Sequence, residues 1–211
     1  MAQNPIKSGD IKQVIKDLEK ETRENPNSVV AHHRLALAYW RANRLEDAIT
    51  SFQKALEIDP TSYQVRINLG TLFFQMGRLE DGIRENKEAL KAHPGSAEAM
   101  ANIGSAYMQL SKWAEAADYF EQALDIKPEM VPALINLSSV LVELDDLERA
   151  VALAEKAVSL SPRFGLARNN LAVAYYFSGD YNRAKEEMER AKEFGYPVHP
   201  DFEKQVNEKA V

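Results

Sequence analysis

The residues that could perform catalysis or bind a metal ion are few and scattered in this sequence. The four histidines are His32, His33, His93 and His199, and cysteine is absent, which excludes a thiolate nucleophile, a disulfide and a zinc–thiolate site. His32 and His33 are neighbours in a predicted helix, where successive side chains point about 100° apart, so they cannot grip one metal ion together. No HExxH motif, Gly-rich phosphate loop or nucleophile elbow occurs. We therefore predict that the protein is not an enzyme and has no catalytic residue, no metal site and no cofactor.

The composition narrows the class of protein further. Of 211 residues, 45% are hydrophobic and 27% are charged, as in an ordinary folded protein. The net charge of -6 disfavours nucleic acid as a partner, because that binding depends on neutralising phosphates with Lys and Arg. No stretch approaches the roughly 20 apolar residues of a membrane span, and Met1 to Asp10 lacks the apolar core of a secretory signal. These features predict a cytoplasmic protein without an integral membrane segment.

A proline recurs with a period of 34 residues and organises the chain. The recurring prolines are Pro26, Pro60, Pro94, Pro128 and Pro162. Between Pro60 and Pro94 lie two amphipathic segments, Tyr63 to Met76 and Leu79 to Ala92, separated by Gly77 and Arg78. A period of this length with two helices per unit predicts an α-solenoid, in which each helical hairpin buries its apolar face against its neighbours.

Large and small side chains recur at fixed places within each period. The first helix carries a large aliphatic residue at Leu35, Leu69, Ile103, Leu137 and Leu171. A small residue follows at Ala36, Gly70, Gly104, Ser138 and Ala172. The second helix carries small residues at Ala48, Gly82, Ala116, Ala150 and Ala184, and again at Ala55, Ala89, Ala123, Ala157 and Ala191. Small residues at constant offsets let two antiparallel helices approach closely, while larger side chains fill the remaining space.

This pattern resembles the tetratricopeptide repeat. The resemblance covers residues 29–196 as five repeats (29–62, 63–96, 97–130, 131–164 and 165–198), and the third fits best. Its matching residues are Ile103, Gly104, Tyr107, Ala116, Phe120, Ala123 and Pro128. The departures are Asn86, Ala154 and Met188 at the aromatic position of the second helix, and Tyr196 at the last proline. The resemblance implies an all-α fold, a right-handed superhelix that binds peptides or proteins.

The two ends of the array are predicted from what precedes and follows the repeats. We expect residues 1–9 to form a flexible tail, residues 10–28 an N-terminal half-repeat helix and residues 199–211 a C-terminal capping helix. The first helix has Ile11, Ile15 and Leu18 at helical spacing. Either it caps the first hairpin, or its apolar face binds a second copy and makes a homo-oligomer. Its basic stripe, Lys12, Lys16 and Lys20, is either solvated or contacts an anionic membrane surface.

Two columns of residues are candidate peptide-binding positions, because the resemblance implies that first helices line the concave groove. One column is Arg34, Asn68, Asn102, Asn136 and Asn170. The other is Trp40, Phe74, Met108, Val142 and Tyr176, with Arg41 beside its first member. An asparagine amide can both donate to and accept from a peptide backbone. The first column resembles the asparagine ladder of O-linked N-acetylglucosamine transferase, which holds extended peptides, although asparagine here could also be family consensus only.

The second helix of repeat 2 departs most from the packing pattern. It carries Gly82 in mid-helix and Asn86 in place of a core aromatic. These departures are either tolerated drift or a sign that the helix from Glu80 to Ala92 opens more readily than its equivalents.

The function predicted from the sequence is a scaffold that binds a peptide or protein segment in the groove. Two alternatives stay open at this stage. One is a self-assembling scaffold at an organelle or membrane surface, of the magnetosome-associated type. The other is a regulatory or chaperone subunit of a larger complex.

Overall fold

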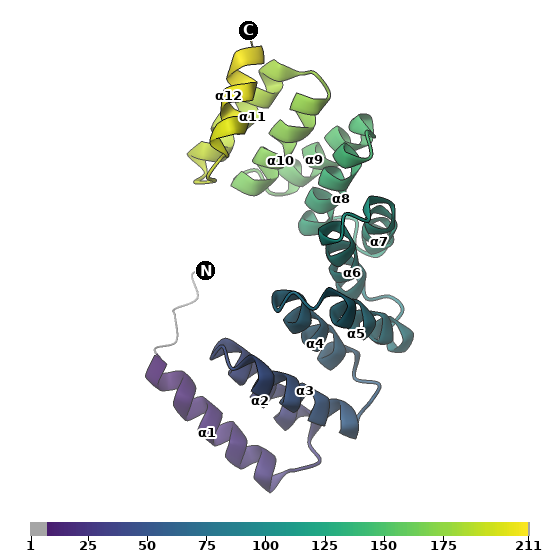
Figure 1. Ribbon diagram of the computed structural model, residues 1–211, viewed down its shortest axis with the longest axis vertical. Coiled ribbons are helices and arrows are strands. Elements are labelled where there is room, and N and C mark those ends of the chain that lie inside the picture. The colour runs from purple at the N-terminus through teal and green to yellow at the C-terminus, as the bar shows by residue number, and fades with distance from the viewer. Residues whose placement is uncertain (1–7, 211) are drawn as a thin grey trace. The chain divides into compact units, whose positions relative to one another are not determined.

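The computed structural model describes residues 8–210, which form twelve helices and no strand (Figure 1). The helices are α1 (Ser8–Glu24), α2 (Val29–Arg41), α3 (Leu45–Ile58), α4 (Tyr63–Gln75), α5 (Leu79–Ala92), α6 (Ala97–Gln109), α7 (Trp113–Ile126), α8 (Val131–Glu143), α9 (Leu147–Leu160), α10 (Gly165–Phe177), α11 (Tyr181–Glu193) and α12 (Pro200–Lys209). Residues 1–7, most of the predicted tail, lie outside the described part. The predicted all-α fold of five helical hairpins between two flanking helices is confirmed.

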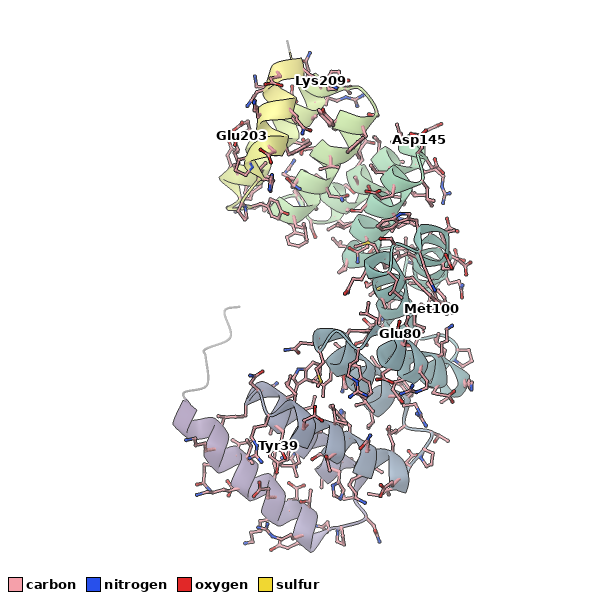
Figure 2. The ribbon with its side chains drawn as sticks, viewed as in Figure 1. Tyr39, Glu80, Met100, Asp145, Glu203 and Lys209 are labelled. Atoms are coloured by element: carbon pink, nitrogen blue, oxygen red, sulfur yellow. The ribbon has the colours of Figure 1, made fainter. Side chains whose placement is uncertain are left out.

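Each hairpin turns through one residue in the left-handed region. These residues are Asn43, Gly77, Ser111, Asp145 and Gly179, with φ between 55° and 85°. In the second hairpin the amide of Arg78 donates to the carbonyl of Phe73 at 2.9 Å, and Gly77 donates to Phe74 at 3.0 Å. Such bonds satisfy carbonyls at the end of the first helix and reverse the chain within three residues. Figure 2 shows Asp145 at the equivalent turn between α8 and α9.

The chain divides into two compact units, Met1–Ala99 and Met100–Val211. In the first unit, α1 packs its apolar face, with Ile15 and Leu18 buried, against the first hairpin. The hydroxyl of Tyr39 on α2 donates to Glu19 Oε1 at 2.7 Å, and burial together with this bond raises the pKa of Tyr39 to about 12 (Figure 2). The half-repeat helix therefore lies on the first hairpin as a cap does.

The second unit ends with α12, which packs on the last hairpin (Figure 1). Gly195, with φ of 79°, follows α11, and Pro200 begins α12. Val206 is fully buried, and the ring of Phe202 lies edge-on to Tyr176 with centroids 5.6 Å apart. Phe202 and Val206 thus share a covered face, as the sequence predicts for a C-terminal capping helix.

A buried arginine ties a proline turn to its hairpin in the second unit. Arg168 Nε donates to the carbonyl oxygen of Pro162 at 2.7 Å, and its Nη1 pairs with Glu187. The two side chains of this ion pair are only 11% and 10% exposed. Arg66 makes the same contacts in the first unit, with the Pro60 carbonyl and with Glu85. The pair therefore joins a turn and both helices of one hairpin.

We expect Arg168→Ala to lower the free energy of unfolding by about 1.5–3 kcal/mol, because it removes the buried donor to Glu187 and to the Pro162 carbonyl. Glu187 then keeps only the more exposed Arg190 as its partner. Urea denaturation followed by circular dichroism measures this change. The matched control is Arg149→Ala, since Arg149 is half-exposed and pairs with Glu121 and Asp146 on the surface. The control is expected to change stability by less than about 1 kcal/mol. Equal losses in the two variants would contradict the structural role assigned to Arg168.

Candidate functional site

The candidate site residues lie at the sixth and twelfth positions of the first helix of each hairpin, except Arg41, which is the thirteenth residue of α2. We call the surface that these positions form within each unit the A face of that unit. In the first unit it belongs to α2 and α4, and in the second unit to α6, α8 and α10. Each unit is described separately below.

In the first unit both sixth-position side chains bond to other parts of the protein. Arg34 Nη1 contacts both carboxylate oxygens of Glu21 on α1, at 2.9 and 3.0 Å. Asn68 Nδ2 donates to His33 Nε2 at 2.7 Å. Burial lowers the pKa of His33, which favours the neutral ring that this hydrogen bond requires. The structure therefore neutralises the charge of Arg34 and gives Asn68 an internal partner.

In the second unit the asparagines connect neighbouring hairpins. Asn136 Nδ2 donates to Ser105 Oγ at 3.4 Å, and Asn170 Nδ2 donates to Ser139 Oγ at 2.6 Å, so each bond joins residues 31 positions apart. Each serine hydroxyl donates in turn to a carbonyl of its own helix, Ser105 to Ala101 and Ser139 to Ile135. One N–H of each amide is thus used inside the protein. Asn102 occupies the same position on α6 and is half-buried.

The side-chain oxygen of Asn170 has no hydrogen-bond donor among the described residues. Asn170 is 8% exposed, and its Oδ1 is buried without a hydrogen-bond donor among the described residues. A buried carbonyl oxygen without a donor is unfavourable by about 1–3 kcal/mol. The amide of Asn170 therefore combines a satisfied N–H with an unsatisfied oxygen that the protein's own atoms cover.

The serines that hold these amides were not among the predicted site residues. A hydroxyl stands three residues after an asparagine at Thr71, Ser105 and Ser139, which is the signal that the sequence offers. The spacing suggests a contact within one helix. The bonds of Asn136 and Asn170 instead run to the preceding hairpin.

The twelfth-position residues of the first unit pack against their neighbours. Trp40 lies edge-on to Phe52 with centroids 6.4 Å apart, and its Nε1 donates to Gln75 Oε1 at 2.6 Å. A Cβ added to Gly82 would lie 2.2 Å from the ring of Phe74. Gly82 therefore makes room for Phe74, and this packing replaces the interpretation of that glycine as tolerated drift. Arg41 is exposed and makes no hydrogen bond or ion pair with the described residues.

The twelfth-position residues of the second unit end in an aromatic cluster. Met108 on α6 is half-buried. Tyr176 contacts the rings of Phe177, Tyr181 and Phe202, with centroids 5.5, 5.5 and 5.6 Å away. Lys209 Nζ lies 5.1 Å from the Tyr176 ring, at the C-terminal end of α12 (Figure 2). The capping helix thus covers part of Tyr176, whereas Phe177 is 55% exposed.

The described residues contain no group of three or more His, Asp or Glu side chains that could hold a metal ion. Within residues 8–210, every helix is too short or too polar to cross a lipid bilayer.

We expect Gly82→Ala to destabilise the protein although alanine favours a helix interior by about 1 kcal/mol over glycine. The reason is the collision of the new Cβ with Phe74. Thermal unfolding measures the effect. In a Phe74→Ala background, which removes the ring, the same glycine substitution should be stabilising; a loss of stability there would show that the ring is not the cause.

The greater opening of α5 stays a prediction. Asn86 is fully buried in this helix, and its Nδ2 donates to the carbonyl oxygen of Gly82 at 2.9 Å. Amide hydrogen exchange should be faster between Glu80 and Ala92 than between Glu115 and Ile126, because a polar core residue replaces the aromatic one. Equal protection of the two segments would contradict the prediction.

Three family models described as tetratricopeptide repeat match this chain, at residues 29–62, 67–131 and 141–196. No curated protein sequence matches it.

Solved structures of similar fold include PilF of Pseudomonas aeruginosa, with a TM-score of 0.82 and 21% identity over 95% of this chain and 91% of that one. YrrB, described as a TPR protein with an unusual peptide-binding site, has a TM-score of 0.72 and 19% identity over 90% and 97%. MamA has a TM-score of 0.69 and 24% identity over 76% and 94%. At these identities the likeness shows the fold alone.

Proposed function

This chain belongs to the tetratricopeptide repeat family, and we propose that it is a non-enzymatic scaffold that binds a segment of a partner protein on its A face. The family and the similar structures support a protein-interaction scaffold. We add to this general role the proposal that the A face binds an extended segment of the partner.

One observation carries the proposal. Asn136 and Asn170 are held in the same orientation on successive first helices by the hydroxyls of Ser105 and Ser139. Equivalent amides at equivalent places can hydrogen-bond a peptide backbone without requiring a particular sequence. Large side chains at the twelfth position of the same helices, among them Met108 and Tyr176, supply apolar contact area beside the amides. YrrB, which shares the fold, is described as having a peptide-binding site, so a peptide is a class of ligand that this fold can bind.

The test uses peptides selected from an unbiased displayed library on the full-length protein. We expect the double variant Asn136→Ala, Asn170→Ala to bind the selected peptides roughly tenfold more weakly or worse, since each lost hydrogen bond contributes about 0.5–1.5 kcal/mol. Fluorescence anisotropy measures the dissociation constants.

The matched control is Gln122→Ala, which removes an exposed amide from the second helix of a hairpin, where it donates to Asp118. Its affinity should equal that of the unmodified protein. A library that yields no binding peptide, or peptides that bind the double variant with unchanged affinity, would refute the proposed function.

The predicted alternatives stay predictions. Self-assembly through α1 was based on an unpaired apolar face, but Ile15 and Leu18 on that face are buried against the first hairpin. Lys12, Lys16 and Lys20 are exposed, as both interpretations of the basic stripe require. The geometry gives no specific support to peripheral association with a membrane or organelle. It likewise gives none to the cytoplasmic location or to a role as subunit of a larger complex.

A further inference from the structure

Two tyrosine rings hold an ammonium group at the C-terminal end of the second unit. Lys209 Nζ lies 5.1 Å from the ring centroid of Tyr176 on α10 and 5.0 Å from that of Tyr181 on α11. It also donates to the hydroxyl of Tyr181 at 3.5 Å, and within residues 8–210 no carboxylate pairs with it. Hydrogen bonding to Tyr176 and Tyr181 raises the pKa of Lys209, which favours the charged form. Aromatic faces attract a cation in this way, so the two rings form a site for a cation.

The rings keep their places without help from Lys209. Tyr176 lies edge-on to Tyr181 with centroids 5.5 Å apart, and Phe202 of α12 lies 5.6 Å away on it. Both tyrosines are half-buried, so packing sets their orientation. Lys209 is by contrast the last residue of α12 and is exposed, and a lysine side chain turns freely on its four-carbon stem. The ammonium can therefore leave the site while the rings stay in place.

A cavity beside the rings favours an incoming cation. It has a volume of about 680 Å³, and Tyr181, Lys209 and Glu148 are among the residues that line it. Glu148 is exposed and makes no hydrogen bond or ion pair with the part of the chain that the structure describes. The other cation of the lining, Arg183, is bound to Asp180, to which its Nε donates at 2.5 Å. When Lys209 withdraws, the charge of Glu148 is left without a counter-charge in the lining, and it attracts a cation.

The two rings lie beside the A face of the second unit. Tyr176 is the twelfth residue of α10 and so belongs to that face. Phe177, the next residue, has its ring 5.5 Å from that of Tyr176 and is 55% exposed, so this end of α10 is open to solvent. A partner segment on the A face can therefore reach the rings with one of its side chains.

We propose that Tyr176 and Tyr181 bind a lysine or arginine side chain of the partner segment, and that Lys209 occupies this site when no partner is bound. The inference rests on the proposed function and specifies its ligand: the segment carries a basic residue where it reaches α10. Glu148 attracts the incoming charge, and Lys209 competes with it. The protein's own lysine thus lowers the affinity for segments that have the basic residue.

The first test uses the peptides selected on the full-length protein. We expect them to share a lysine or arginine, and we expect its replacement by norleucine, which removes the charge, to weaken binding about three- to tenfold in fluorescence anisotropy. Tyr181→Leu, which removes one ring, should weaken the basic peptide by a similar factor and leave the norleucine peptide unchanged. Selected peptides without a shared basic residue, or equal affinities of the basic and norleucine peptides, would overturn the proposal.

The second test removes the competing ammonium. We expect Lys209→Gln to bind the basic peptide about two- to fivefold more tightly and the norleucine peptide with unchanged affinity. The matched control is Lys156→Gln, which removes an exposed lysine of α9 that has no ion pair among the described residues. Its affinity for both peptides should stay the same at physiological salt, where exposed charges are screened. Circular dichroism verifies that each variant is folded. An unchanged affinity of Lys209→Gln, or an equal gain for the two peptides, would refute the competition by Lys209.

The outcomes separate this inference from the proposed function. If the selected peptides bind in a manner that depends on Asn136 and Asn170, while neither norleucine nor Tyr181→Leu changes their affinity, the scaffold role stands and the cation site is wrong. If the library yields no binding peptide, both fail.

Discussion

The close fit of a small residue on the first helix against a fully buried residue on the second is the interaction on which each hairpin depends. The small residues are Ala36, Gly70, Gly104, Ser138 and Ala172, and the buried residues sixteen positions later are Phe52, Asn86, Phe120, Ala154 and Met188. At Gly104 an added Cβ would lie 3.0 Å from the ring of Phe120, and at Gly70 it would lie 2.1 Å from Asn86 Nδ2. Because two helices can approach this closely only where one side lacks bulk, the pair sets how the hairpin closes. The size of the partner varies from Ala154 to Phe52 and Phe120, yet its complete burial does not.

Once the hairpins are fixed, polar side chains set the register between neighbours within a unit. Asn170 bonds to Ser139 across two hairpins of the second unit, and His33 bonds to Asn68 across two hairpins of the first. Within a hairpin, Arg168 holds the carbonyl of a proline turn. Each of the two bonds between hairpins can form only if the two first helices that it joins lie side by side. The residues that shape the A face therefore also hold it together, so that a variant intended to weaken binding must always be checked for folding.

The sequence predicts the helices well because their signals are local. The small residues at constant offsets, the two amphipathic segments and the proline between units are all visible in the sequence of one repeat and its neighbour. The side-chain contacts of the site are less predictable, because they join elements that are distant along the chain. Arg34 is predicted as a groove residue but pairs with Glu21 of α1, and Tyr176 is partly covered by Phe202 of α12. Such outcomes depend on the side-chain contacts of the flanking helices α1 and α12, which the repeat pattern does not predict.

The asparagine position of the first helices contributes both to the packing between hairpins and to the candidate binding surface. A free amide on a surface would rotate between two orientations, and a ligand would have to select one of them at an entropic cost. The hydroxyl of Ser139 removes that choice before any ligand arrives, since it accepts the N–H of Asn170 and leaves Oδ1 on the other side. The Ser139 bond therefore stabilises the packing of α10 on α8, while Oδ1 of Asn170 stays buried without a donor among the described residues. Asn136, whose side chain is only half-buried, is the amide of this pair that a ligand on the A face can reach more readily.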